Sequence, residues 1–162
     1  MAISTIAGVG AGSSGTILTT GSPQSGGVIQ VVSSVFSTSQ TTSNNAFVTT
    51  GFAVSITPKF STSKVLVRVN GGMCDTNGTA QQGILTILRG ASTNLGDSIR
   101  GLAQFYNAAG RQQTPIAMEI LDSPATTSST TYTIYFRANG AYTVGIEIDP
   151  AYLSMTLMEI AA

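Results

Sequence analysis

The sequence contains no histidine and no tryptophan, and only 9% of its 162 residues are charged. Without histidine the chain lacks the usual general base, the Ser-His and Cys-His nucleophile pairs and the commonest metal ligand. Its seven basic and seven acidic residues cancel, so no electrostatic field attracts a phosphate backbone or an acidic lipid surface. We therefore expect a protein that is not an enzyme, holds no cofactor or metal, and does not bind nucleic acid.

Cysteine is also nearly absent, because Cys74 is the only one in the chain. A single cysteine excludes an intrachain disulfide and a zinc site built on cysteine pairs. We interpret Cys74 as a small buried apolar side chain. No run approaches the roughly 18 apolar residues of a membrane span, and the N-terminus lacks a basic stretch followed by an apolar one. The sequence thus predicts neither a membrane segment nor a secretion signal.

The composition divides the chain into two regions. Residues 1–27 consist mainly of Gly, Ser, Thr and Ala, and they cannot close a hydrophobic core of their own. They predict an extended, flexible N-terminal arm in front of a single domain at residues 28–162, a length that supports one core. The candidate partner-binding residues are the small apolar side chains of this arm: Ile3, Ile6, Val9, Ile17 and Leu18.

The second region consists of short runs rich in Val, Ile, Thr, Tyr and Phe, separated by Gly, Pro, Asn, Asp and Ser. Such runs are typical of β-strands. We predict strands near residues 28–36, 46–56, 64–72, 82–89, 94–100, 114–121, 130–138, 142–148 and 152–160. The sequence offers no sustained helical periodicity, and only residues 101–111 could hold a helical turn.

Several of these runs alternate between apolar and polar residues, which gives a strand one buried face and one wetter face. Two opposed sheets would bury all the apolar faces, so the fold class predicted is an all-β antiparallel sandwich or jelly roll preceded by the arm. The faces expected in the core are Val65, Val67 and Val69; Tyr132, Ile134 and Phe136; and Val144, Ile146 and Ile148.

Turn residues lie between these runs. Asn139-Gly140 predicts a tight hairpin, because both residues tolerate positive φ. Asp75-Thr76-Asn77-Gly78 begins like a calcium-binding loop, but its twelfth position is Thr86 where such a loop needs a bidentate glutamate. We therefore read it as a plain turn.

Two further patterns suggest chemistry. Gly10-Ala11-Gly12-Ser13-Ser14-Gly15 matches the dinucleotide fingerprint G-x-G-x-x-G, but no helix pattern follows and the first acidic residue is Asp75. The sequence contains enough acidic residues to supply a pair of carboxylates for glycoside cleavage, but acids spaced in this way are more commonly unrelated, solvated surface residues. The acids concerned are Glu119, Asp122, Glu147, Asp149 and Glu159.

Five phrases, in order along the chain, carry a resemblance to a known group of proteins: residues 63–69 (SKVLVRV), 83–90 (GILTILRG), 121–124 (LDSP), 131–137 (TYTIYFR) and 157–160 (LMEI). Together they resemble small virion proteins of tailed phages whose domain is similar to the trimeric jelly roll of the tumour-necrosis-factor and complement type. The likeness covers residues 28–162.

The resemblance implies a homotrimer within a virion, assembled in the host cytoplasm. The residues are compatible with self-association, since the runs at 83–88 and 155–158 are apolar on both faces. We expect a capsid decoration or cement protein whose arm contacts the major capsid protein or another virion protein. The alternative is a short tail fibre or tail-tip knob that binds host-surface glycan through loops near residues 73–82, 90–97 and 103–113.

Overall fold

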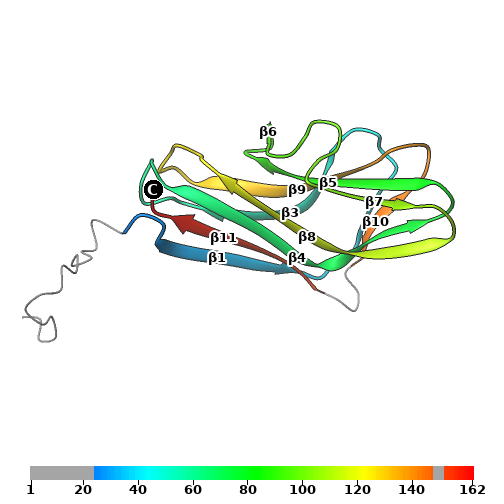
Figure 1. The fold of residues 1–162 in the computed structure, drawn as a ribbon, viewed down its shortest axis with the longest axis horizontal. Helices are drawn as coiled ribbons and strands as arrows, with labels where there is room; N and C mark the ends of the chain where they lie inside the picture. Colours follow the sequence, from blue (N-terminus) through cyan, green and yellow to red (C-terminus); the bar gives the residue numbers. More distant parts are fainter. Residues whose placement is uncertain (1–23, 148–151) are drawn as a thin grey trace, which may run out of the picture.

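The computed structural model describes residues 24–147 and 152–162, and within these ranges every regular element is a β-strand (Figure 1). Two antiparallel sheets form a sandwich, as the alternating runs predict. The six-stranded sheet contains β1 (Val28–Phe36), β2 (Gln40–Thr42), β4 (Lys64–Asn77), β8 (Arg111–Asp122), β10 (Val144–Glu147) and β11 (Leu153–Ile160). The five-stranded sheet contains β3 (Val48–Ile56), β5 (Gln81–Arg89), β6 (Thr93–Asn94), β7 (Ala103–Asn107) and β9 (Thr130–Ala138).

The long strands stand in the order β1-β11-β4-β8 in one sheet and β3-β9-β5-β7 in the other. The chain crosses between the sheets after β2, β3, β4, β7, β8 and β9, and this order is that of a jelly roll. The first and last long strands, β1 and β11, are neighbours, so both ends of the domain lie together (Figure 1).

The core lies between the sheets and contains the faces expected from alternation. Val65, Val67 and Val69 are fully buried, while Lys64 and Arg68 on the same strand are exposed. The inward residues of β9, Tyr132, Ile134 and Phe136, are buried too, as are Val144 and Ile146 of β10. Ile148 lies outside the described residues.

β4 changes its partner at Gly71. It pairs with β11 up to Gly71 and with β10 from Met73 onward, with a register shift at the same point in its ladder with β8. Gly71 has φ of +93°, and a Cβ there would lie 2.1 Å from the carbonyl oxygen of Tyr152. Only glycine allows the two backbones to approach this closely.

Four local predictions were wrong. The strand expected at 94–100 is almost entirely loop, and the helical turn allowed at 101–111 is replaced by β7, which pairs with β5. Asn139-Gly140 does not form a hairpin, because β9 and β10 belong to different sheets. Asp75 lies within β4, where its ladder with β8 continues to Asn77, so the turn falls after that residue.

The apolar outer face of β5 is covered by its own chain. Ile84 and Leu88 point away from the core yet are buried. The loop at 95–102 runs along the edge of β5, where the Leu95 and Leu102 N–H groups donate to the Ile87 and Leu85 carbonyls. Its glycines, Gly96 and Gly101, lie close against the outward side chains of Thr86 and Ile84. The apolar excess in this run therefore does not require a neighbouring subunit, contrary to the inference from sequence.

Candidate protein interface

The outer face of the six-stranded sheet carries an apolar row. Register places Val31 opposite Met158, Met158 opposite Leu66, and Leu66 opposite Leu121. These four residues, which we call the apolar row, cross β1, β11, β4 and β8, the strands that lie side by side in Figure 1. A continuous apolar row on an outer sheet face marks a surface suited to contact with another protein.

The ends of the row are the most exposed. Val31 is 55% exposed and Leu121 is 48% exposed, whereas Leu66 and Met158 between them are half-buried by their neighbours. On β1 the row continues along the strand, since Val28 is 56% and Val35 is 60% exposed. Burying these side chains against a partner would release apolar surface from water at about 25 cal/mol per Å².

Among the described residues β1 pairs only with β11, and its other edge lacks the usual protection against pairing. Edge strands are normally guarded by charged residues or proline, but Val28–Phe36 contains neither. The opposite edge strand, β8, contains Arg111, Pro115 and Glu119. Within the part of the chain that the structure describes, the sheet therefore has protective residues at its β8 edge and none at its β1 edge.

A polar row borders the apolar one. The hydroxyls of Ser33 and Thr156 lie 3.0 Å apart, and Arg68 Nε lies 3.2 Å from Glu119 Oε2. Both charged side chains are more than half exposed, so their pair adds little stability to the folded chain. An apolar row beside a polar one has the layout of an interface centre and its rim.

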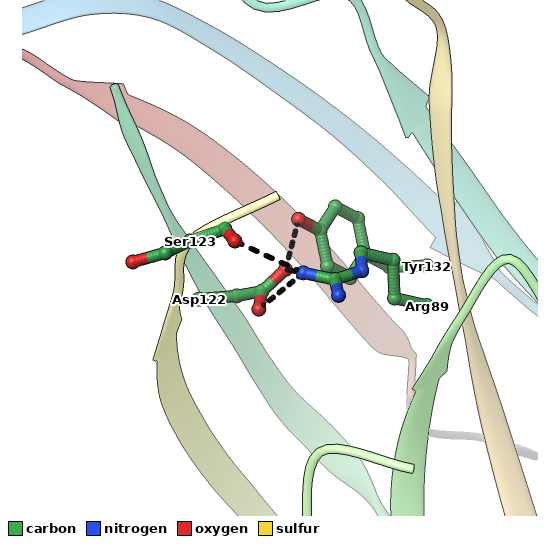
Figure 2. Close-up of polar contacts among 4 residues, drawn as sticks. All are labelled: Arg89, Asp122, Ser123 and Tyr132. Carbon is green, nitrogen blue, oxygen red and sulfur yellow. Dashed lines mark hydrogen bonds and ion pairs between the residues drawn. The ribbon is translucent and has the colours of Figure 1, made fainter. Parts of the chain in front are cut away.

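A polar cluster fixes the end of β8 next to Leu121. Arg89 NH1 donates to both carboxylate oxygens of Asp122 at 2.7 and 2.8 Å, and to the Ser123 carbonyl at 3.3 Å (Figure 2). The Tyr132 hydroxyl donates to Asp122 Oδ2 at 2.7 Å (Figure 2). Burial, and then the hydrogen bond to Asp122, raises the pKa of Tyr132, so the phenol stays protonated. These residues join the two sheets and hold β8 in place.

Glu159 holds the other edge strand, β1, in place in a similar way. It is fully buried and accepts hydrogen bonds from Gln30 Nε2 at 2.6 Å and from the Lys59 and Phe60 N–H groups at 2.7 and 3.2 Å. Burial acts to raise the pKa of Glu159, but these hydrogen bonds outweigh it and lower the pKa. The ionised carboxylate thus ties β11 to β1 and to the connection between β3 and β4.

The carboxylates considered for glycoside cleavage have different partners. Glu119 pairs with Arg68 on the surface, Asp122 with Arg89, and Glu159 with buried donors. Asp149 and the side chain of Glu147 lie outside the described part. In residues 24–147 and 152–162 no group of three Cys, Asp or Glu side chains could hold a metal ion.

Cys74 is buried, as interpreted from the sequence. Burial, and then the neighbouring Asp75 carboxylate, raises the pKa of the Cys74 thiol well above its ordinary value. It borders a gap of about 360 Å³ between β7 and β8, beside Phe105 and Ile116. A protonated, enclosed thiol is a poor nucleophile.

The arm residues Ile3, Ile6, Val9, Ile17 and Leu18 lie outside the described residues. The described chain begins at Gln24 and is tied at once to the other terminus, because the Gly26 N–H donates to the Ala161 carbonyl at 2.7 Å. The Ala161 N–H donates in turn to the Gly27 carbonyl at 2.9 Å. Residues 24–27 therefore lie beside the end of β11 and lead directly into β1.

Sequence reasoning missed the apolar row. Val31 and Val35 belong to a run in which apolar residues fall on both faces, so alternation does not show which of them is outside. The absence of any charge in that run was the available signal.

No family model matches the sequence, and no curated protein is similar to it. Within the described part of the chain no helix is long and apolar enough to cross a membrane.

Proposed function

We propose that this chain is a virion structural protein, a homotrimeric capsid decoration or cement protein that attaches to the particle through its N-terminal arm. The observation that carries the proposal is the apolar row next to the uncharged edge of β1. This surface suits a second copy of the same chain, because its centre is apolar and its rim holds both an arginine and a glutamate.

The resemblance of residues 28–162 to small phage virion proteins supports a trimer over other closed assemblies. In a ring of three, the contact is heterologous, so one copy's sheet face meets a different surface of the next copy. The arms of all three copies would then leave the assembly at equivalent positions and reach the major capsid protein or another virion protein. The protein would be located in the virion after assembly in the host cytoplasm.

Light scattering coupled to size exclusion tests the self-association. We expect a trimer at micromolar concentration for the full chain, and dissociation when Val31→Lys and Leu121→Lys are combined. Tyr106→Lys is the matched control, since Tyr106 is 57% exposed on the other sheet and should leave the trimer intact. A monomeric wild-type chain, or a double variant that stays trimeric, would contradict the proposal.

The second candidate is a short tail fibre or tail-tip knob. The arrangement of arm and jelly roll would be the same, but the domain would face the host surface. Two measurements separate the candidates: the copy number per purified particle, which should match that of a capsid lattice for cement, and the location of the protein in a map of the particle. A few copies at the tail would overturn the cement assignment.

A further inference from the structure

A polar pocket of about 310 Å³ lies on the outer face of the five-stranded sheet. Register sets Arg137 of β9 opposite Ile84 of β5, and Ile84 opposite Gln104 of β7. The Asn139 N–H donates to the Gln82 carbonyl, which continues the same face by one more row. Arg100 and Ile99 border the pocket from the loop between β6 and β7.

Arg137 is a buried cation without a carboxylate partner in the described part of the chain. Its side chain is 8% exposed and forms none of the ion pairs found there. NH1 donates to the Asn45 carbonyl at 3.1 Å and to the Ala138 carbonyl at 3.4 Å, NH2 donates to the Ile99 carbonyl, and the buried Nε has no partner. The guanidinium lies over the Phe47 ring, 5.4 Å from its centroid. Buried charges are normally paired, so this one leaves the pocket with uncompensated positive charge.

The amide side chains of the pocket form a directed chain. Asn139 Nδ2 donates to Gln82 Oε1 at 2.7 Å, and Gln82 Nε2 donates to Gln104 Oε1 at 2.8 Å. Gln104 Nε2 donates to the Arg100 carbonyl at 3.1 Å. The chain occupies the side-chain oxygens of both glutamines, while each NH₂ group keeps a second N–H. The amide side chains that line the pocket therefore offer a ligand more hydrogen-bond donors than acceptors.

Arg100, which borders the pocket, adds a second positive charge to this region. Asp97 is its nearest acidic neighbour in sequence, and two backbone hydrogen bonds, helped by the charge of Arg100, lower the pKa of Asp97. The Asp97 carboxylate accepts the Ile99 and Arg100 N–H groups at 2.9 and 2.6 Å, and among the described residues it forms no close ion pair with the side chain of Arg100. These hydrogen bonds fix the loop, which is also pinned by mutual backbone bonds between Asp97 and Gly101. The pocket is thus held by three paired strands, β9, β5 and β7, and by a hydrogen-bonded loop.

We infer that this pocket binds a monosaccharide that carries a carboxylate, a sugar acid of the uronic type. Two guanidinium groups suit the carboxylate, the free amide N–H groups suit ring and hydroxyl oxygens, and the volume suits a single sugar ring. Tyr106 stands opposite Gln82 in register and is 57% exposed, which places an aromatic ring beside the same face for stacking. The inference does not depend on the proposed function, and it would hold for a decoration protein or for a fibre knob.

Saturation-transfer NMR on the full chain tests it, with sodium galacturonate as the probe and galactose as the neutral comparison. We expect saturable binding of galacturonate and at least about tenfold weaker binding of galactose. Arg100→Gln should weaken galacturonate binding by about tenfold, and Gln104→Glu should abolish it by placing a fixed carboxylate among the donors. Both positions are exposed, so folding is retained where Arg137→Gln could lose it. Arg68→Gln, on the other sheet, is the matched control and should bind as wild type.

Equal binding of the two sugars, or unchanged binding by Arg100→Gln, would overturn the inference. Two further probes separate the parts of the ligand: acetate tests whether the sugar ring is needed, and inorganic phosphate tests whether the carboxylate is preferred to another anion. Acetate that binds as tightly as galacturonate would overturn the saccharide assignment, and phosphate that displaces galacturonate at lower concentration than acetate does would overturn the carboxylate. None of these outcomes affects the trimer or its attachment to a particle.

Discussion

The Tyr132 hydroxyl lies 2.7 Å from Asp122 Oδ2, and this hydrogen bond connects the two sheets of the sandwich. Tyr132 belongs to β9 in the five-stranded sheet, whereas Asp122 is the last residue of β8 in the six-stranded sheet. Because Leu121 precedes Asp122, the same contact that joins the sheets also sets the end of the apolar row. Stability and the proposed interface are therefore coupled at this point.

Tyr132→Phe removes that hydrogen bond and leaves Asp122 bound only to Arg89 and the chain around it. We expect a loss of about 1 to 2 kcal/mol in the free energy of unfolding, measured by urea denaturation at neutral pH. Tyr135→Phe is the control, because Tyr135 faces outward from the same strand and should change stability by less than about 0.5 kcal/mol. Equal effects at the two positions would show that the contact contributes nothing specific.

The same pair predicts a response to alkaline pH. Burial and the bond to Asp122 raise the pKa of Tyr132 in the folded chain, so the unfolded chain loses this proton first, near the ordinary value of 10.0. The stability from the protonated phenol is complete below that pH and falls as pH rises above it. The difference in unfolding free energy between wild type and Tyr132→Phe should shrink above about pH 10. A constant difference would contradict the raised pKa.

The lowered pKa of Glu159 predicts the opposite pH dependence of stability, in acid. Its hydrogen bonds lower the pKa in the folded chain, so the stability that they supply is present above the ordinary value of 4.5 and is lost as pH falls through the folded value. Glu159→Gln should cost about 2 kcal/mol at pH 7, and the gap to wild type should close below about pH 4.5. Glu119→Gln, which removes only an exposed pair, should cost less than about 1 kcal/mol. A gap that persists in acid would exclude the carboxylate as its cause.

Gly71→Ala tests the point where β4 changes partner. A Cβ would lie 2.1 Å from the Tyr152 carbonyl oxygen, and the φ of +93° is unfavourable for alanine. We expect a loss of about 3 kcal/mol or more. Gly90→Ala is the matched control, since Gly90 has φ of +59° and nothing within 4 Å of the added Cβ, so it should cost only about 1 kcal/mol. Similar thermal shifts for the two variants would mean that the backbones separate easily here.

Truncating the N-terminal arm tests whether it attaches the protein to the particle. Deleting residues 1–20 should leave the domain folded and trimeric but severely weaken attachment to the particle, and replacing Ile3, Ile6 and Val9 together with Ser should weaken it in part. Salt should matter little, because residues 1–27 carry no charged side chain. Sedimentation of decorated particles measures both effects. Full attachment by the truncated chain, or release of the full chain by moderate salt, would place the attachment in the sandwich domain.

Much of the fold could be predicted from the sequence, because strand alternation is a local property. Val65, Val67 and Val69 sit on one face by the geometry of any strand, and the only way to bury that face here is a second sheet. The all-β class, most strand positions and the burial of Cys74 follow from the same reasoning. None of these depends on which strands become neighbours.

Which strands become neighbours could be learned only from the tertiary structure. The apolar row exists only because the register joins Val31, Met158, Leu66 and Leu121, which come from four separate strands. The pocket at Arg137 likewise depends on the loop that runs along β5. The hairpin expected at Asn139-Gly140 and the helical turn allowed at 101–111 do not form, because β9, β10 and β7 pair with strands far away in the sequence. Pairing between strands far apart in sequence is decided by the total burial and hydrogen bonding of the whole chain, and no local window contains that sum.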